Sequence, residues 1–183
     1  MEQKAGRKTL DMVYIALFAV VMAICSWIVI PTAVPFTLQT FGVFLAVLVL
    51  GGKRGSFAVF LYILMGILGL PVFSGFTGGA GVLLGHTGGY IMGFLLLSVT
   101  MWIFEALFGQ NMRIYWISMI LGLLLCYGFG TFWYIAVYAK STKETGIITV
   151  ISLCVLPFIV PDIIKMILAM AIRKRLIKVV RSS

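Results

Sequence analysis

Apolar residues follow one another along this chain in long stretches that no charged residue interrupts. There are four such stretches, which cover residues 12–52, 55–104, 114–139 and 145–161. About 20 apolar residues cross a bilayer as an α-helix, so each of the first two stretches is long enough for two helices. Proline and glycine end or kink helices, and they divide these two stretches at residues 31–35 and 69–81.

The pattern predicts six membrane-spanning helices. Their expected bounds are about 12–30, 37–51, 55–70, 83–108, 114–138 and 147–175. The last span contains Pro157 and Pro161, so it is either one kinked helix or a short membrane segment followed by a helix. We therefore expect an all-α, polytopic membrane protein, with residues 1–183 as a single domain. We expect no cleavable signal, because no small-residue cleavage site follows the first apolar run.

Composition supports a lipid environment. Of the 183 residues, 62% are apolar and 10% are charged, whereas a soluble domain is about 45–50% apolar and about 25% charged. A soluble core of this length could not bury so much apolar surface. A soluble enzyme and a nucleic-acid-binding domain are therefore excluded, despite the net charge of +9.

The basic residues are divided unevenly between the two sides of the predicted bundle. Eleven Lys and Arg lie on the side of both termini, only Lys140 and Lys143 lie on the opposite side, and Lys165 lies within a span. Cytoplasmic loops carry an excess of Lys and Arg, so we expect both termini in the cytoplasm. Topology and contact with anionic lipid account for the basic surplus without nucleic acid.

The sequence contains no motif of a familiar catalytic or metal chemistry. Cys25, Cys126 and Cys154 lie far apart in apolar runs, as packing residues do, and no CxxC or His cluster suggests a metal. There is no HExxH, no pair of aspartates and no P-loop, and the sequence Val72-Phe-Ser-Gly75 lacks the first glycine of a rhomboid-like Gly-x-Ser-Gly. We expect neither an enzyme nor an intrinsic ATPase, and no cofactor.

An Asp and a Lys lie inside the last predicted span, at Asp162 and Lys165. Ionisable residues in a span are costly, usually face the bundle interior and mark a substrate or ion pathway. The i, i+3 spacing places both on one helix face, where they partly neutralise each other. Two interpretations remain open: a structural ion pair, or a donor–acceptor site for a small polar head group. A passive channel or a purely structural protein would not need such a pair.

The loops expected at 31–40 and 71–84 contain no charged residue. Irregular backbone at membrane depth is tolerated where it lines a cavity, so these loops either fold over a ligand or form a re-entrant plug. The only histidine, His86, follows the second loop, and a lone His is more often structural than a ligand.

Two patterns of small residues suggest close helix packing. Glycines 81, 85, 89 and 93 recur every four residues, which in one helix would form a smooth stripe for another helix or for a flat ligand. Ala16, Ala19 and Ala23 lie on one face of the first span. The helix that packs on this alanine face belongs either to this chain or to another subunit.

Five segments of the sequence carry a resemblance to a known family. They are Pro35-Phe-Thr-Leu-Gln-Thr40, Leu50-Gly-Gly-Lys-Arg-Gly55, Gly69-Leu-Pro-Val-Phe-Ser-Gly75, Gly85-His-Thr-Gly-Gly-Tyr-Ile-Met-Gly93 and the Pro-Asp-x-x-Lys at 161–165. In this order, from about residue 9 to 175, they resemble BioY, the biotin-binding S-component of energy-coupling factor (ECF) vitamin transporters.

The resemblance implies a function and a location. Such a subunit captures biotin from outside, joins a transmembrane coupling protein and two ATPases, and topples in the prokaryotic cell membrane to deliver the vitamin inside. The alternatives are an S-component for another vitamin, riboflavin or thiamine, and a solitary biotin carrier.

The resemblance also implies roles for individual residues. Asp162 and Lys165 would bind the fused-ring head of biotin. The alanine face would contact the coupling protein, through the frame Ala19 and Ala23 or through Ala16 with Val20. The further residues expected in the binding site are Gln39, Thr77, Gly78, Gly79 and Tyr90.

Three positions depart from the pattern of the resembled family. Thr77 stands where some members have Asn, and Ile91 stands where some have Arg. The carboxylate of biotin is then expected to use loop backbone N–H groups or Tyr90. His86 stands where Pro is common.

Overall fold

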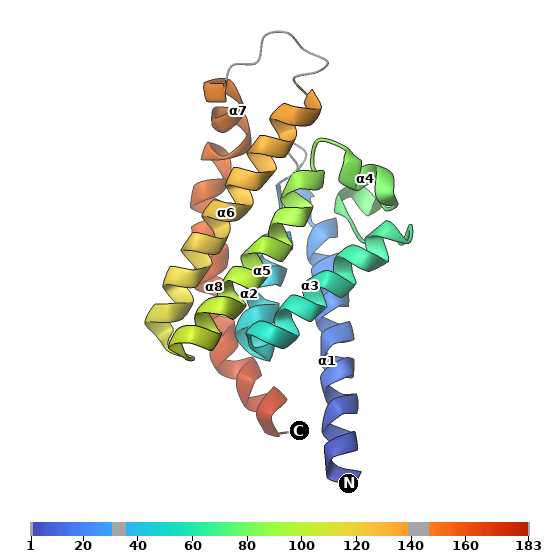
Figure 1. The fold of residues 1–183 in the computed structure, drawn as a ribbon, viewed down its shortest axis with the longest axis vertical. Helices are drawn as coiled ribbons and strands as arrows, with labels where there is room; N and C mark the ends of the chain where they lie inside the picture. Colours follow the sequence, from blue (N-terminus) through green and yellow to red (C-terminus); the bar gives the residue numbers. More distant parts are fainter. Residues whose placement is uncertain (1, 31–35, 139–146, 183) are drawn as a thin grey trace.

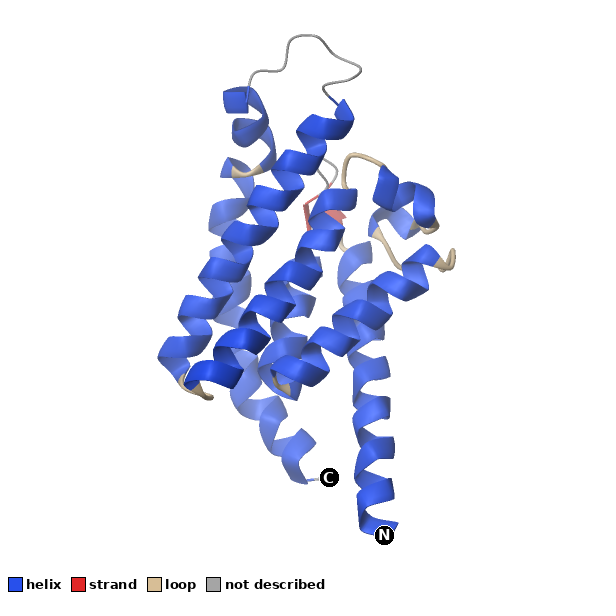
Figure 2. Ribbon diagram, in the orientation of Figure 1, coloured by secondary structure: helices blue, strands red, loops and turns tan. Residues whose placement is uncertain are grey.

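The computed structural model describes residues 2–30, 36–138 and 147–182, and Figure 1 shows the arrangement of its elements. The described elements are α1 (Glu2–Trp27), β1 (Val29–Ile30), β2 (Phe36–Thr37), α2 (Gln39–Leu50), α3 (Gly52–Ile67), the 3-10 helix η1 (Ser74–Phe76), α4 (Ala80–Leu84), α5 (Gly88–Phe108), α6 (Met112–Tyr138), α7 (Ile147–Cys154) and α8 (Leu156–Ser182). The described chain is nearly all helix, with one short antiparallel pair of strands, β1 and β2 (Figure 2). Residues 31–35 of the loop expected at 31–40, and Lys140 and Lys143, lie outside the described residues.

Four helical stretches of the described chain are long and apolar enough to cross a bilayer. They cover Lys8–Trp27, Gly88–Phe108, Met112–Val137 and Val150–Lys178, and the last of them runs across α7 and α8. By length and composition, these helices are those of a multi-pass membrane protein. Helices α2 and α3 have 12 and 16 residues, and 12 residues span about 18 Å at 1.5 Å per residue. The expected count of six spans stays a prediction.

Helix α2 lies in the middle of the bundle. It packs against α1, α3, α5 and α8, and eleven of its twelve residues are buried. A helix that is apolar all round is stable only when other helices surround it. The polar exceptions are Gln39 and Thr40 in its first turn, and their burial already marks this end of α2 as unusual.

Close glycine contacts join α5 to α6. A Cβ at Gly93 would lie 2.7 Å from Sγ of Cys126, and one at Gly89 would lie 2.3 Å from Cβ of Trp133. The stripe of four glycines expected on one helix is wrong in its first half. Gly81 belongs to α4, and Gly85 has the extended backbone that ends α4. The chain therefore turns between Leu84 and Gly88, so the span expected at 83–108 begins as α5 at Gly88.

The final predicted span consists of two helices. Helix α7 ends at Cys154 and α8 begins at Leu156, which agrees with a short segment followed by a helix. Pro157 lies in the first turn of α8. Backbone N–H groups in a first turn have no partner within the helix, so the N–H that proline lacks costs no helical hydrogen bond. Pro161 lies inside α8, one residue before Asp162.

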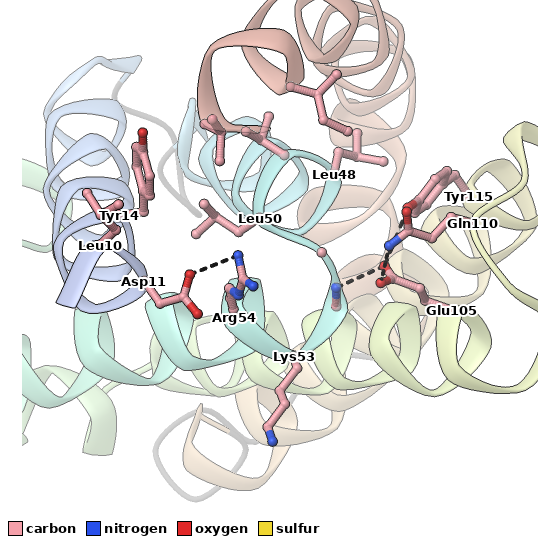
Figure 3. Close-up of a pocket in the computed structure, with 15 residues that line it drawn as sticks. Leu10, Asp11, Tyr14, Leu48, Leu50, Lys53, Arg54, Glu105, Gln110 and Tyr115 are labelled. Atoms are coloured by element: carbon pink, nitrogen blue, oxygen red, sulfur yellow. Dashed lines mark hydrogen bonds and ion pairs between the residues drawn. The ribbon is translucent and has the colours of Figure 1, made fainter. Parts of the chain in front are cut away.

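Both termini lie at one end of the bundle, and α4 and α7 lie at the other (Figure 1). At the terminal end, the turn between α2 and α3 borders a cavity of about 640 Å³. Arg54 pairs with Asp11 of α1 at 3.0 Å. A carboxylate oxygen of Glu105 accepts the backbone N–H of Gly52 at 2.9 Å, and Figure 3 shows both interactions. These contacts hold the far end of α2, and so they help to fix the helix that carries Gln39 and Thr40.

Candidate functional site

A second cavity, of about 440 Å³, lies where the first turn of α2, the loop 73–87 and helices α5, α6 and α8 meet. It is lined by Thr37, Gln39, Thr40, Phe73, Ser74, Thr77, Gly81, Val82, Gly85, His86, Thr87, Tyr90, Ile91, Phe94, Cys126, Tyr127, Cys154, Phe158, Asp162 and Lys165. Apolar surface makes most of the wall, although many of the lining residues also carry a polar group. This is the usual composition of a small-molecule site.

The Asp162–Lys165 pair lies at the deep end of the cavity. Asp162 is 1% exposed and Lys165 is 4% exposed, and Nζ of Lys165 donates to Oδ1 of Asp162 at 2.7 Å. Helix α8 brings the two side chains together because residues three apart are neighbours on a helix surface. A buried charge is very costly unless it is paired and hydrogen-bonded, and this pair is both.

Two hydroxyl groups from other helices complete the hydrogen bonding of the pair. Oγ1 of Thr40 donates to Oδ1 of Asp162 at 2.7 Å and accepts from Nζ of Lys165 at 3.0 Å. The phenol of Tyr127 in α6 donates to Oδ2 of Asp162. Three helices, α2, α6 and α8, therefore converge on one carboxylate.

The charged pair keeps hydrogen-bonding positions that a ligand can use. An ionised carboxylate has about four lone-pair positions, and an ammonium group has three N–H donors. Asp162 uses three of the four positions, and Lys165 uses two of its three donors. One acceptor and one donor remain. A head group that offers an N–H and a C=O can use both, and further bonds require Thr40 or Tyr127 to rotate away.

Aromatic rings border the ammonium group of Lys165. Its Nζ lies 4.3 Å from the ring centre of Phe36, and Phe36 packs against Phe158 with 5.8 Å between ring centres. An aromatic face attracts a cation within about 6 Å. Phe158 lines the cavity, so a flat apolar ring could pack beside the charged pair.

Gln39 lines the cavity but faces Tyr62 rather than Asp162. Its Nε2 donates to the hydroxyl of Tyr62 at 2.6 Å, and its Oε1 accepts from Oγ1 of Thr37 at 2.8 Å. Both ends of the amide are thus engaged. Gln39 positions the first turn of α2, and its neighbour Thr40 contacts the charged pair.

The expected loop residues divide into two groups. Thr77 lines the cavity and closes its own turn by donating to the carbonyl of Ser74 at 2.9 Å. Gly78 and Gly79 are not among the residues that line the cavity, and their contact with a ligand stays a prediction. A Cβ at Gly78 would lie 2.2 Å from the carbonyl oxygen of Leu70. The N–H of Gly79 donates to Gly66 at 2.7 Å. These glycines fix the loop against the end of α3, and Gly81 and Gly85 line the cavity instead.

Tyr90 lines the cavity from α5 and leans on α6. Its hydroxyl lies 3.3 Å from Oγ1 of Thr131, and its ring occupies the space left by Gly130. Ile91 is buried and also lines the cavity. At the position where some members of the resembled family have Arg, Ile91 therefore adds apolar surface to the cavity wall.

Sequence reasoning missed Thr40, Tyr127 and Phe158. Thr40 ends the segment Pro35–Thr40 and is a polar residue beside an apolar run, which is a usable signal. Tyr127 lies in a span with several aromatic residues and carried no signal of its own. Its contact with Asp162 depends on how α6 packs against α8.

Comparison with known proteins explains this arrangement. The family model described as BioY family matches residues 1–182. The biotin transporter BioY of Thermotoga maritima is 39% identical over 163 residues, which is 88% of this chain and 92% of that protein. A probable biotin transporter BioY of Pyrococcus horikoshii is 38% identical over 92% of this chain and 97% of its own length. The chain belongs to the BioY family.

A solved crystal structure has the same fold. It is described as the S-component for biotin from an ECF-type ABC transporter, and it matches with a TM-score of 0.80 at 30% identity. The match covers 94% of this chain and 93% of that one. The fold class expected from the sequence, an all-α membrane protein of the ECF S-component type, is therefore confirmed.

The alanines of α1 lie in two different environments. Ala19 and Ala23 are 0% and 3% exposed and belong to the core, where α1 packs against α2 and α3. They let helices of this chain approach closely, and a role for these two in binding another subunit stays a prediction. Ala16 is exposed, as is Val20 at 48%. The frame Ala16 with Val20 is the one that a partner could reach.

Proposed function

We propose that this chain is a substrate-binding membrane subunit that captures biotin. The observation that carries the proposal is the Asp162–Lys165 pair, buried and hydrogen-bonded at the deep end of a cavity of about 440 Å³. A purely structural ion pair would need no cavity beside it. In membrane proteins, ionisable residues that border a cavity commonly mark a substrate pathway.

The chemistry of biotin suits the groups at this end of the cavity. Its ureido ring offers N–H donors and one carbonyl acceptor. Asp162 retains one acceptor position for an N–H, and Lys165 retains one donor for the carbonyl. Thr40 both donates and accepts, so it can reorient when a second ureido N–H reaches the carboxylate.

The remaining walls suit the rest of the biotin molecule. Ile91, Phe94 and Phe158 line the cavity with apolar surface, and the sulfur-containing ring and the hydrocarbon chain of biotin are apolar. Burial of this surface favours binding, and the buried polar pair sets specificity, because a ligand without a matching head group would leave Asp162 and Lys165 incompletely paired.

We further propose that delivery requires an ECF module, in which a coupling protein and two ATPase subunits assemble with this chain in the prokaryotic cell membrane. The excess of Lys and Arg at the terminal end supports cytoplasmic termini. The binding cavity would then open outward, because the loops that line it lie at the end opposite the termini. In this scheme the present chain binds biotin, and ATP hydrolysis belongs to the ATPase subunits.

Two measurements test the proposal. Calorimetric titration of the purified chain should detect biotin binding and should detect none with riboflavin or thiamine. Binding of one of those vitamins in place of biotin would overturn the substrate assignment. Uptake of labelled biotin should then depend on co-expression of the coupling protein and ATPases, and equal uptake without them would identify a solitary carrier.

A further inference from the structure

The end of helix α1 holds the segment that leads into the cavity wall. The hydroxyl of Ser26 donates to the carbonyl of Val72 at 2.6 Å, and the indole N–H of Trp27 donates to the carbonyl of Pro71 at 2.8 Å. Two adjacent residues of α1 therefore bind two adjacent carbonyl groups. The next residue, Phe73, is fully buried, so the chain enters the loop 73–87 at a fixed point.

Residues 73–77 form a tight hairpin beside the cavity. The N–H of Phe73 donates to the carbonyl of Thr77 at 2.9 Å, and the hydroxyl of Thr77 donates to the carbonyl of Ser74 at 2.9 Å. Phe73, Ser74 and Thr77 all line the cavity, whereas Phe76 does not belong to the lining residues. Its side chain is 63% exposed. One side of the hairpin is thus cavity wall, and the ring of Phe76 lies outside that wall.

The backbone of Phe76 has a conformation that phenylalanine rarely adopts. Its φ is 58°, and Phe76 is the one residue other than glycine with a positive φ in the described part of the chain. The Cβ atom makes this left-handed region costly, and a bulky side chain is a rare occupant of it. Such a residue persists only where its surroundings hold it, and strain of this kind is concentrated at functional sites.

Trp27 supplies the contact that holds Phe76. The two rings are stacked, with 4.9 Å between their centres and 21° between their planes. An aromatic pair in such contact contributes more than the burial of its area alone. Because Trp27 is itself fixed by its bond to Pro71, the stacked rings connect the end of α1 to the hairpin that carries Ser74 and Thr77.

We infer that Trp27 and Phe76 are positioning residues for ligand binding: their stacked rings hold the hairpin 73–77 against the cavity and slow the departure of the ligand. This inference rests on the proposed function, because the ligand is biotin. Neither ring has to touch biotin, since the pair acts through the wall that Ser74 and Thr77 provide. Without the stack the hairpin loses its attachment to α1, and this part of the wall can move away from the ligand.

The test measures how fast biotin leaves the purified chain. Labelled biotin is bound, an excess of unlabelled biotin is added, and release of the label is followed over time. Trp27→Leu removes the stacking ring, so release should be about three- to tenfold faster, the range of one aromatic pair. Trp27→Phe also loses the indole N–H but keeps a ring, so it should release biotin within about twofold of the wild type. The difference between the two variants isolates the stack from the bond to Pro71.

Phe76→Gly separates positioning from the stability of the fold. Glycine adopts a positive φ without strain, and this gain offsets the lost ring contact, so the unliganded variant should melt close to the wild type. Biotin should still leave it about three- to tenfold faster, because the hairpin is no longer attached to α1. In the double variant with Trp27→Leu, release should stay within about twofold of the faster single variant, since both changes remove one contact.

A control and the contrary outcomes complete the experiment. Phe132 of α6 is as exposed as Phe76, at 67%, and does not belong to the residues that line the cavity, so Phe132→Leu should release biotin at the wild-type rate. A folded Trp27→Leu chain with the wild-type release rate would overturn the positioning role, and so would a Trp27→Phe chain that releases biotin as fast as Trp27→Leu. Absence of biotin binding by the wild type would overturn the proposed function, and this inference with it.

Discussion

The single hydroxyl of Thr40 connects both members of the charged pair. It donates to Asp162 and accepts from Lys165, and the three atoms lie in a closed triangle with Nζ–Oδ1 at 2.7 Å. Removal of one member of a buried hydrogen-bond network strongly affects stability, because the remaining polar groups have no water to bond to.

Replacement of Thr40 tests this connection. Thr40→Val keeps the shape of the side chain and removes the hydroxyl, so Asp162 loses a donor and Lys165 loses an acceptor. A buried polar group left without its partner costs about 1–3 kcal/mol, so we expect a lower melting temperature for the unliganded chain. The matched control Thr40→Ser keeps the hydroxyl and should melt close to the wild type. Equal behaviour of Val and Ser would contradict the role given to the hydroxyl.

At this scale, the sequence predicted the part of the site that is local. Asp162 and Lys165 lie three residues apart, so helix geometry alone brings them together. Thr40 lies 122 residues from Asp162 in the sequence, and Tyr127 lies 35 residues from it. Such contacts depend on which helices pack together, and one sequence carries no direct signal of that packing.

Helix α1 presents two different faces along its length. One face, with Ala19 and Ala23, packs into the core against α2 and α3, and the other, with Ala16 and Val20, is exposed. Small residues permit close helix approach on either face. In this structure the frame of Ala16 and Val20 is the one that faces away from the core.

A pair of matched substitutions distinguishes the two faces. Ala16→Leu enlarges the exposed face, so the isolated chain should fold and bind biotin as the wild type does, while uptake by an assembled transporter should fall. Ala19→Leu inserts the same atoms into the core, where overpacking costs about 1–3 kcal/mol. It should lower the melting temperature of the isolated chain. Normal uptake by a stable Ala16→Leu chain would show that the coupling protein binds elsewhere.

The ends of the helices were predictable where glycine or proline sets them. Helix α2 ends at Leu50 before Gly51, whose φ of 85° suits glycine, and the break between α7 and α8 lies beside Pro157. The break between α4 and α5 was not foreseen. Glycines at a spacing of four fit a helix by periodicity, but they equally permit extended backbone, and the contact of Gly85 with Trp133 decides between the two.

The bundle as a whole has a structural end and a binding end. At the terminal end, Glu105 accepts hydrogen bonds from the N–H of Gly52, from Gln110 at 2.9 Å and from Tyr115 at 3.4 Å (Figure 3). Arg173 of α8 donates to the carbonyl of Leu48 at 2.9 Å. Helices α5 and α8 are thereby both fastened to the turn between α2 and α3, and none of these residues lines the binding cavity.

This separation predicts that stability and binding can be changed independently. Glu105→Ala removes the acceptor of three hydrogen bonds and should lower stability by about 1–3 kcal/mol, measured as a lower melting temperature. Under conditions where the variant is fully folded, its affinity for biotin should remain within about twofold of the wild-type value. The control Lys53→Ala, at an exposed side chain that points away from the network in Figure 3, should change neither. A tenfold loss of biotin affinity in folded Glu105→Ala would show that the two ends are coupled.

Fold class followed from sequence because lipid imposes strong and simple constraints. Long charge-free stretches must be helical, since every backbone polar group needs a partner inside the segment. The binding cavity was not predictable in the same way. Its volume depends on how the loop 73–87 folds against α5 and α6, and composition and periodicity do not specify that packing.

The central claim is that Asp162 recognises the head of biotin, and one titration tests it most directly. Biotin is titrated calorimetrically into the purified wild-type chain and into Asp162→Asn, after both are shown to be folded by thermal melting. Removing one member of a desolvated charge pair commonly costs about 2–5 kcal/mol, and about 1.4 kcal/mol is tenfold in affinity. We predict that Asp162→Asn binds biotin at least tenfold more weakly. A folded Asp162→Asn chain that binds biotin as tightly as the wild type would contradict the account and leave Asp162 and Lys165 as a structural ion pair.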